Sequence, residues 1–236
     1  MKLSEVIPWG WSFDEYRLMF GLTEKDLAGR ILGCGDGPAS FNAEATAEGH
    51  SVISCDPIHA LSAEEIRRRA EDSYDAVISQ VRLSPEGFVW DYCHDPDHLG
   101  QARLAAMRRF LLDFEEGKTE GRYVAASLPS LPFGDGQCDI ALCSHFLFLY
   151  SDQLGLEFHR ASIEELLRVA AKVRIFPLLT LERRTSPHVE PLMTYLDEKG
   201  WRTEIRSVAY EFQRGGNRML RIGKDDHPPR FAASSG

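Results

Sequence analysis

Three glycines at alternate positions are the first residues of this chain that suggest chemistry. Gly33, Gly35 and Gly37 lie in the stretch ILGCGDGPAS, where an apolar run gives way to small residues. We expect a strand to turn into a helix here. Glycine lets a ligand approach the backbone closely, and a helix N-terminus offers free N–H groups. The stretch therefore predicts a ligand that is held by the backbone itself.

A carboxylate ends the next apolar run. Asp56 follows SVISC and stands roughly 20 residues after Gly35. In a doubly wound sheet, a carboxylate at this place hydrogen-bonds the ribose hydroxyls of a bound nucleoside. Alone, a glycine-rich turn is only a turn, and an Asp after a strand is a helix cap. Strand, G-x-G-x-G, helix, strand and Asp in series predict a nucleoside site.

Pro38 argues against a dinucleotide in that site. The dinucleotide fingerprint G-x-G-x-x-G would place its third glycine at position 38, which is occupied by proline. Proline has no N–H, whereas a pyrophosphate needs several donors at this turn. A nucleoside without phosphates is less demanding. An NAD-dependent oxidoreductase is therefore the weakest of the functions that we consider.

The elements that must position these residues alternate between strand and helix. The sequence predicts strands near 29–35, 51–57, 123–127, 138–150 and 172–179, and helices at 39–48, 155–171 and 188–200. Two further strands, 201–212 and 217–223, are joined by a turn without a helix. We expect an α/β fold: a doubly wound, Rossmann-like, seven-stranded and mostly parallel sheet with an antiparallel last strand pair.

One long segment interrupts this alternation. Residues 58–122 contain two helical runs, whereas a single crossover helix needs far fewer residues. We predict a helical lid insertion between strands 2 and 3. The whole forms a single domain at 1–223 that opens with short helices at 1–28, the first begun by an S-x-x-E capping box at Ser12. The tail 224–236 is predicted to be loose.

Composition limits the classes of partner. The formal net charge of −9 is opposite to what a phosphate backbone attracts, so no nucleic-acid partner is expected. No apolar run approaches the roughly 18 residues of a membrane span, and the N-terminus does not read as a secretory signal. Most of the five cysteines lie in apolar strand-like runs, which indicates a reduced chain. We expect a cytoplasmic protein without a membrane partner, and leave open a homodimer.

Two longer stretches carry a resemblance to a known family. ILGCGDGPASFNAEATAEGHSVISCDPI resembles the first motif and the following acid of the class I S-adenosylmethionine-dependent methyltransferases. LPSLPFGDGQCDIALCSHFLF resembles the later stretch of that family, through its fourth strand. The order and spacing hold over about residues 29–222. The resemblance implies a methyltransferase that uses S-adenosylmethionine as its cofactor and holds a small-molecule acceptor under the lid.

The resemblance also implies roles for single residues. The cofactor-binding set comprises Gly33, Cys34, Gly35, Gly37, Asp56, Pro57, Ser127, Leu128, Ser144, Tyr16 and Arg17. The glycines would pass under the methionine part, and Asp56 would hold the ribose. Ser127 stands where many members carry an acid near the adenine amino group. Tyr16 and Arg17 would close over the methionine end, or would equally well pack the opening helix onto the core.

The acceptor side of the site is less specified. His145, at the end of the fourth predicted strand, is the candidate catalytic base, and the alternative is a hydrogen-bonded histidine in the pocket wall. Trp90, Tyr92 and His94 are candidates for acceptor binding, and the alternative is that they anchor the lid. No metal site is predicted, because no C-x-x-C or H-E-x-x-H partner accompanies the histidine pair 94 and 98.

Two further functions stay open beside a small-molecule methyltransferase. A protein that binds the cofactor without transferring its methyl group stays open because the sequence shows no obvious base beyond His145. A protein methyltransferase would use the lid as a docking surface. The N-P-P-Y type stretch expected for amino-group methylation of nucleic-acid bases is absent after the fourth predicted strand, which continues SHFLF.

Overall fold

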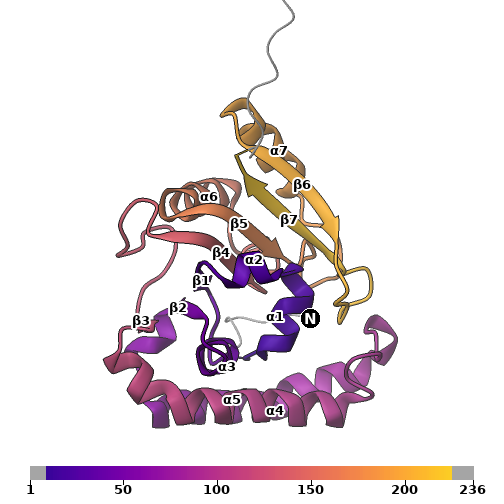
Figure 1. Cartoon of the computed structure of the whole chain (residues 1–236). Helices are drawn as coiled ribbons and strands as arrows, with labels where there is room; N and C mark the ends of the chain where they lie inside the picture. The colour runs from indigo at the N-terminus through magenta and orange to yellow at the C-terminus, as the bar shows by residue number, and fades with distance from the viewer. Residues whose placement is uncertain (1–8, 225–236) are drawn as a thin grey trace, which may run out of the picture.

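The computed structural model describes residues 9–224, and the predicted loose tail from residue 225 lies outside this range. Within it, the strands form one sheet in the order β3-β2-β1-β4-β5-β7-β6 (Figure 1). The strands are β1 (Arg30–Cys34), β2 (Ser51–Cys55), β3 (Tyr123–Val124), β4 (Cys138–Ser144), β5 (Ala170–Phe176), β6 (Arg202–Ser207) and β7 (Arg218–Gly223). Strands β1 to β5 pair in parallel, and β7 is antiparallel to both β5 and β6. The predicted fold class is confirmed.

Helices cover both faces of the sheet. They are α1 (Phe13–Phe20), α2 (Glu24–Leu27), α3 (Phe41–Ala47), α4 (Ala63–Leu83), α5 (Pro96–Thr119), α6 (Leu156–Val169) and α7 (Val189–Glu198). Successive residues of a strand point to opposite faces. Ile31 therefore packs with α1 and α3, while its neighbour Leu32 packs with α6 and α7. The predicted capping box begins α1, because Ser12 Oγ accepts the Glu15 N–H.

The lid insertion is a pair of long helices. Helices α4 and α5 lie side by side beneath α3 in Figure 1. Phe110 and Phe114 of α5 pack on Tyr123 of β3, so α5 also serves as the crossover helix that returns the chain to the sheet. Helix α4 is the added element, and it borders the carboxyl edge of the sheet. Among the described residues no helix is both long and apolar enough to span a bilayer.

The third, fourth and sixth predicted strands are too long, and the fourth ends at Ser144. The third keeps only Tyr123 and Val124, because the chain turns back on itself through a bridge between Ser127 and Ser130. The sixth ends at Ser207, and residues 208–217 leave the sheet to cross the lid. There Val89 N–H donates to the carbonyl of Phe212 at 2.8 Å, and Arg214 N–H donates to that of Gly87 at 3.0 Å. Long-range backbone bonds of this kind leave no periodic signal in the sequence.

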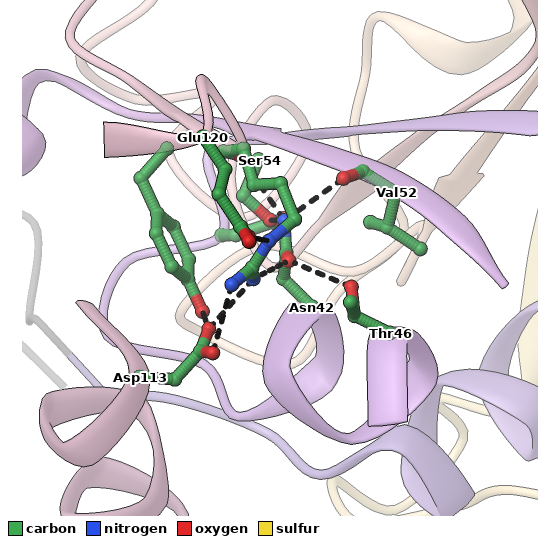
Figure 2. A network of polar contacts seen from close by, with 9 residues as sticks. Asn42, Thr46, Val52, Ser54, Asp113 and Glu120 are labelled. Carbon is green, nitrogen blue, oxygen red and sulfur yellow. Dashed lines mark hydrogen bonds and ion pairs between the residues drawn. The ribbon is translucent and has the colours of Figure 1, made fainter. Parts of the chain in front are cut away.

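A polar network ties the lid to the sheet (Figure 2). Arg122 donates to both carboxylate oxygens of Asp113 on α5, at 2.7 and 2.8 Å, and to Asn42 Oδ1 at 2.9 Å. Asn42 Nδ2 lies within hydrogen-bond distance of the carbonyls of Val52 and Arg122 and of Ser54 Oγ. The fully buried Asn42 therefore joins α3, β2 and the segment before β3.

Replacing Asn42 with leucine should destabilise the fold. The change removes one acceptor from the Arg122 guanidinium and one donor from each of the Val52 and Arg122 carbonyls, the second of which keeps the Ser54 N–H at 2.7 Å. A buried polar group left without a partner costs about 1–3 kcal/mol. We expect the free energy of unfolding, measured with urea, to fall by about 3 kcal/mol. Thr46→Val removes a single 3.3 Å bond to Asn42 and serves as the matched control. Equal losses in the two variants would contradict this reading of the network.

Candidate active site

A cavity of about 1160 Å³ opens where the parallel strands β1, β2 and β4 end. It lies beside the boundary between β1 and β4, from which the chain winds outward in both directions. Open α/β sheets bind their ligands at such a switch point. Small-molecule sites typically measure about 300–1,000 Å³, so this cavity has room for two ligands side by side.

The glycine loop forms one wall of the cavity. Cys34, Gly35 and Gly37 line it, whereas Gly33 lies within β1 behind the loop. Gly35 has a φ of 72°, a left-handed conformation that favours glycine, and a Cβ there would lie 3.2 Å from the Phe146 side chain. A Cβ at Gly33 would lie 1.8 Å from Asp36 Oδ2. The loop therefore needs glycine both for its own turn and to seat Asp36.

Asp36 is a site residue that the sequence analysis missed. Its carboxylate is buried, with Oδ1 accepting from Tyr16 OH at 2.8 Å and Oδ2 from Ser54 Oγ at 2.7 Å. Burial, with a smaller contribution from the nearby Asp56 carboxylate, raises the pKa of Asp36 to about 7, and the two hydroxyl donors limit this rise. An acid inside a glycine turn was the available signal. Asp36 also lines the cavity, so a titrating group stands at the ligand wall.

Asp56 stands beside the glycine loop. Its Oδ2 accepts the Gly37 N–H at 2.9 Å, and its Oδ1 accepts the Ile58 N–H at 2.9 Å, which caps a short 3₁₀ turn at Pro57–Ala60. Each carboxylate oxygen has two lone pairs, so one on each stays available for a ligand. Asp56 is half-buried and lines the cavity. The helix-cap alternative is therefore correct, and it leaves the predicted ribose contact possible.

Other predicted cofactor residues divide into two groups. Pro57, Ser127, Leu128 and Ser144 line the cavity together with the loop. Tyr16 and Arg17 do not. Tyr16 is fully buried, stacked on Phe41 at 4.1 Å, and reaches the site only through its bond to Asp36. Arg17 lies on the surface 3.4 Å from Glu24. Tyr16 therefore fits the alternative of packing the opening helix onto the core, whereas Arg17 does neither.

The predicted acceptor residues lie outside the cavity. Trp90 Nε1 donates to the Pro85 carbonyl at 3.1 Å, and its ring meets that of Phe212. Tyr92 packs edge-on against Tyr210, and His94 stacks on His98. These residues anchor the lid to segment 208–217 or face solvent, because the loop that carries them bends away from the sheet edge. The aromatic side chains that do line the cavity include Trp9, Trp11, Phe88 and Phe212.

His145 lies at the cavity wall at the end of β4. Its ring stacks on Trp11 with a centroid distance of 4.0 Å, and Arg103 lies over the same indole at 3.9 Å. Its Nδ1 lies 2.9 Å from Ser144 Oγ. Burial, together with the positive charge of Arg103, lowers the pKa of His145 to about 3. The imidazole is therefore neutral at physiological pH, and it is a weak base that can still donate or accept a hydrogen bond.

A metal centre finds no support in residues 9–224, where no three His, Cys, Asp or Glu side chains gather as ligands would. The five cysteines are all free and buried. The groups that line the cavity include carboxylates, backbone amides, hydroxyls and aromatic rings.

Comparison with known proteins adds one close relative. No family model matches the chain. The uncharacterized protein MJ0045 of Methanocaldococcus jannaschii is 31% identical over 223 residues, which cover 94% of this chain and 98% of that protein. Among solved structures, magnesium protoporphyrin IX methyltransferase from Synechocystis, with bound SAM, is 14% identical over 90% of this chain and 91% of its own, with a TM-score of 0.41. A SAM-dependent methyltransferase from Aquifex aeolicus is 16% identical over 89% and 87%, with a TM-score of 0.43.

Identity of 31% over almost the full length of both proteins shows common descent. The fold follows from the strand order and strand directions of the sheet, with its antiparallel β7 inserted between β5 and β6. The chain belongs to the same family as the M. jannaschii protein MJ0045, and its fold is that of the class I S-adenosylmethionine-dependent methyltransferases.

Proposed function

We propose that this protein is an S-adenosylmethionine-dependent methyltransferase that acts on a small-molecule acceptor. The observation that carries the proposal is the cavity at the switch point of the sheet. One half is bounded by the glycine loop and by Asp56, whose carboxylate keeps lone pairs for two hydroxyl donors. The volume of about 1160 Å³ leaves space for an acceptor beside the cofactor.

The residues around Asp56 suit a nucleoside. Asp56 would accept hydrogen bonds from the ribose hydroxyls. Pro57, Ile58 and Leu128 offer an apolar surface for the adenine, and Ser127 offers a hydroxyl at its edge. The loop at Cys34–Gly37 would lie along the methionine part. When bound, S-adenosylmethionine supplies an electrophilic methyl group.

The acceptor half, which is the part of the cavity away from the glycine loop and Asp56, would act mainly by positioning the acceptor and by excluding water. Aromatic rings surround it, and orientation alone contributes strongly to a displacement between two held reactants. His145 stays neutral and would orient the hydroxyl or amine of an acceptor by a hydrogen bond. Its low pKa makes strong proton abstraction unfavourable. This favours acceptors that are readily deprotonated or nucleophilic in their neutral form.

Transfer of labelled methyl groups tests the proposal. The purified protein is incubated with methyl-labelled S-adenosylmethionine and a cell extract that has been separated into small molecules and macromolecules. We expect label in the small-molecule fraction, and none with Asp56→Ala. Label confined to macromolecules would replace the proposal by a protein methyltransferase. Cofactor binding without transfer to either fraction would favour a protein that binds the cofactor only. The low pKa of His145 fits that alternative too, because it leaves the site without a strong base.

A further inference from the structure

Arg183 is a cation at the end of the cavity beside Gly87 and Phe88. Helix α4 begins just after Asp56 and its 3₁₀ turn, and it extends for about 30 Å at 1.5 Å per residue. Side chains of α4 from Arg69 to Leu83 line the cavity, and Phe88 lines it just beyond the C-terminal end of the helix. Arg183 lines the cavity there, with its guanidinium carbon 5.8 Å from the centre of the Phe88 ring.

The backbone holds Arg183 in an unusual conformation. Its φ is 62°, in the left-handed region that non-glycine residues rarely adopt. The turn is fixed by Arg183 N–H donating to the Thr180 carbonyl at 2.9 Å, and by Leu181 N–H donating to that of Leu149 at 3.0 Å. Strained residues of this kind cluster at ligand-binding sites. Glycine or asparagine would fit this turn with less strain, so the arginine side chain is the feature to explain.

A place for the guanidinium is built into the lid. A Cβ on Gly87 would come within 1.1 Å of Arg183 Nη1, so the guanidinium occupies the space that a side chain at 87 would take. No carboxylate among residues 9–224 forms an ion pair with it. The adjacent Arg184, by contrast, pairs with Glu182. Arg183 is an exposed residue, and its guanidinium lies against Gly87 and Phe88 without an acidic partner among the described residues.

The surroundings of Arg183 are apolar and aromatic, with two amide groups. Trp9, Val81, Leu181 and Phe212 line the cavity together with Phe88. The other charged side chains of the lining belong to the glycine loop and the first half of α4: Asp36, Asp56, Arg69 and Asp72. The side-chain amide oxygens of Gln80 and Gln213 are buried in the cavity wall without a partner among the described residues. Each of these two oxygens can accept a hydrogen bond from a ligand in the cavity.

We propose that this end of the cavity binds a hydroxy- or amino-substituted aromatic carboxylate, and that this compound class is the methyl acceptor. The oxygen or nitrogen of the acceptor would form a bond to the methyl group as the sulfonium–methyl bond breaks, S-adenosylhomocysteine would leave, and the proton of the hydroxyl or amine would pass to solvent. The planar fork of Arg183 matches a carboxylate with two parallel hydrogen bonds. The aromatic rings stack on a flat body, and the amide oxygens of Gln80 and Gln213 accept from an O–H or N–H group other than the reacting one, which His145 would orient. The role as acceptor rests on the proposed function, whereas the carboxylate subsite itself does not.

Binding of matched carboxylates and amides tests this subsite. The probes are 4-hydroxybenzoate, 4-aminobenzoate and 4-hydroxyphenylacetate, each beside its neutral amide, titrated into the protein with and without S-adenosylhomocysteine. We expect each carboxylate to bind roughly 10- to 100-fold more tightly than its amide. Arg183→Asn, which suits the left-handed turn, should abolish that preference. Arg184→Asn, the matched control, should keep it.

Three outcomes would overturn the inference. They are a wild-type protein with no preference for carboxylates, a preference that survives Arg183→Asn, and no binding by any probe. Failure of the methyltransferase proposal would look different. S-adenosylhomocysteine would then fail to bind, while the carboxylates would still bind through Arg183.

Discussion

Replacing Arg103 with leucine is expected to lower the free energy of unfolding by about 3–5 kcal/mol. Arg103, on lid helix α5, is almost fully buried and forms an ion pair with the equally buried Glu15 of α1. Its Nη1 also donates to the Gly10 carbonyl at 2.9 Å. The variant leaves the Glu15 carboxylate buried without a cation, and removing one partner of a buried pair is far costlier than removing both.

Tyr210 explains why this pair matters to the whole molecule. Its hydroxyl donates to Glu15 Oε1 at 3.0 Å, so the pair joins the opening helix, the lid and segment 208–217. Arg103 also lies over Trp11, which stacks on His145 at the cavity wall. The ion pair therefore fixes the lid against the sheet and supports the acceptor half of the site.

Urea unfolding of three variants measures the effect. Arg109→Leu is the matched control on the same helix, because Arg109 is two-thirds exposed and pairs with Glu44 at 3.1 Å. Such exposed pairs contribute about 0–1 kcal/mol. The double variant Arg103→Leu with Glu15→Leu should recover part of the loss, since no charge is then left buried. A loss for Arg103→Leu no greater than that for Arg109→Leu would contradict the account.

Replacing Asp36 with asparagine should stabilise the protein at pH 8. The pKa of Asp36 is about 7 in the folded chain, against about 3.9 for an unperturbed Asp. Above pH 7 the folded state holds a desolvated carboxylate that the unfolded state solvates freely. The penalty grows as the pH rises from about 4 to 7, and it reaches up to about 4 kcal/mol. Asparagine keeps the shape of the side chain without that penalty, and it loses one of the two bonds that the carboxylate accepts from Tyr16 and Ser54, because an amide nitrogen cannot accept.

The sign of the pH dependence distinguishes this prediction from a general effect. We expect the gain of Asp36→Asn to be about 2–4 kcal/mol at pH 8 and to vanish below about pH 3, where both states of the wild type carry a protonated Asp36. Urea unfolding at several pH values measures it, with the exposed Asp152→Asn as control. A gain that does not change with pH, or a loss at pH 8, would show that Asp36 is not held as described. A carboxylate kept at such a cost in stability points to a role in the site.

The sheet and the edge at which the cavity lies could be predicted from the sequence, because the sequence patterns that indicate them are local. Alternating strands and helices predicted the sheet, the S-x-x-E pattern predicted the start of α1, and the glycine turn followed by Asp56 predicted the edge at which the cavity lies. Each of these three patterns depends on residues that lie close together in the sequence. Buried parallel strands also read as short apolar runs, which the sequence shows directly.

The acceptor half could not be predicted, because long-range contacts decide it. Trp90 and Tyr92 stand next to Phe88 in the sequence, yet only Phe88 lines the cavity. The direction of that loop is set by backbone bonds to segment 208–217, more than a hundred residues away. An aromatic residue in a loop carries no information about which side it faces. Likewise, the burial that raises the pKa of Asp36 follows from packing and not from its neighbours in sequence.

The most direct test of the account is a calorimetric titration with S-adenosylhomocysteine. Wild-type protein and Asp56→Ala are compared, with Asp152→Ala as a control for the loss of an exposed carboxylate. We predict a dissociation constant in the micromolar range for the wild type and the control. Binding to Asp56→Ala should be roughly 100-fold weaker, because charge-assisted bonds to two ribose hydroxyls are lost. No heat with the wild type, or equal affinity in all three proteins, would contradict the assignment of this cavity to the cofactor.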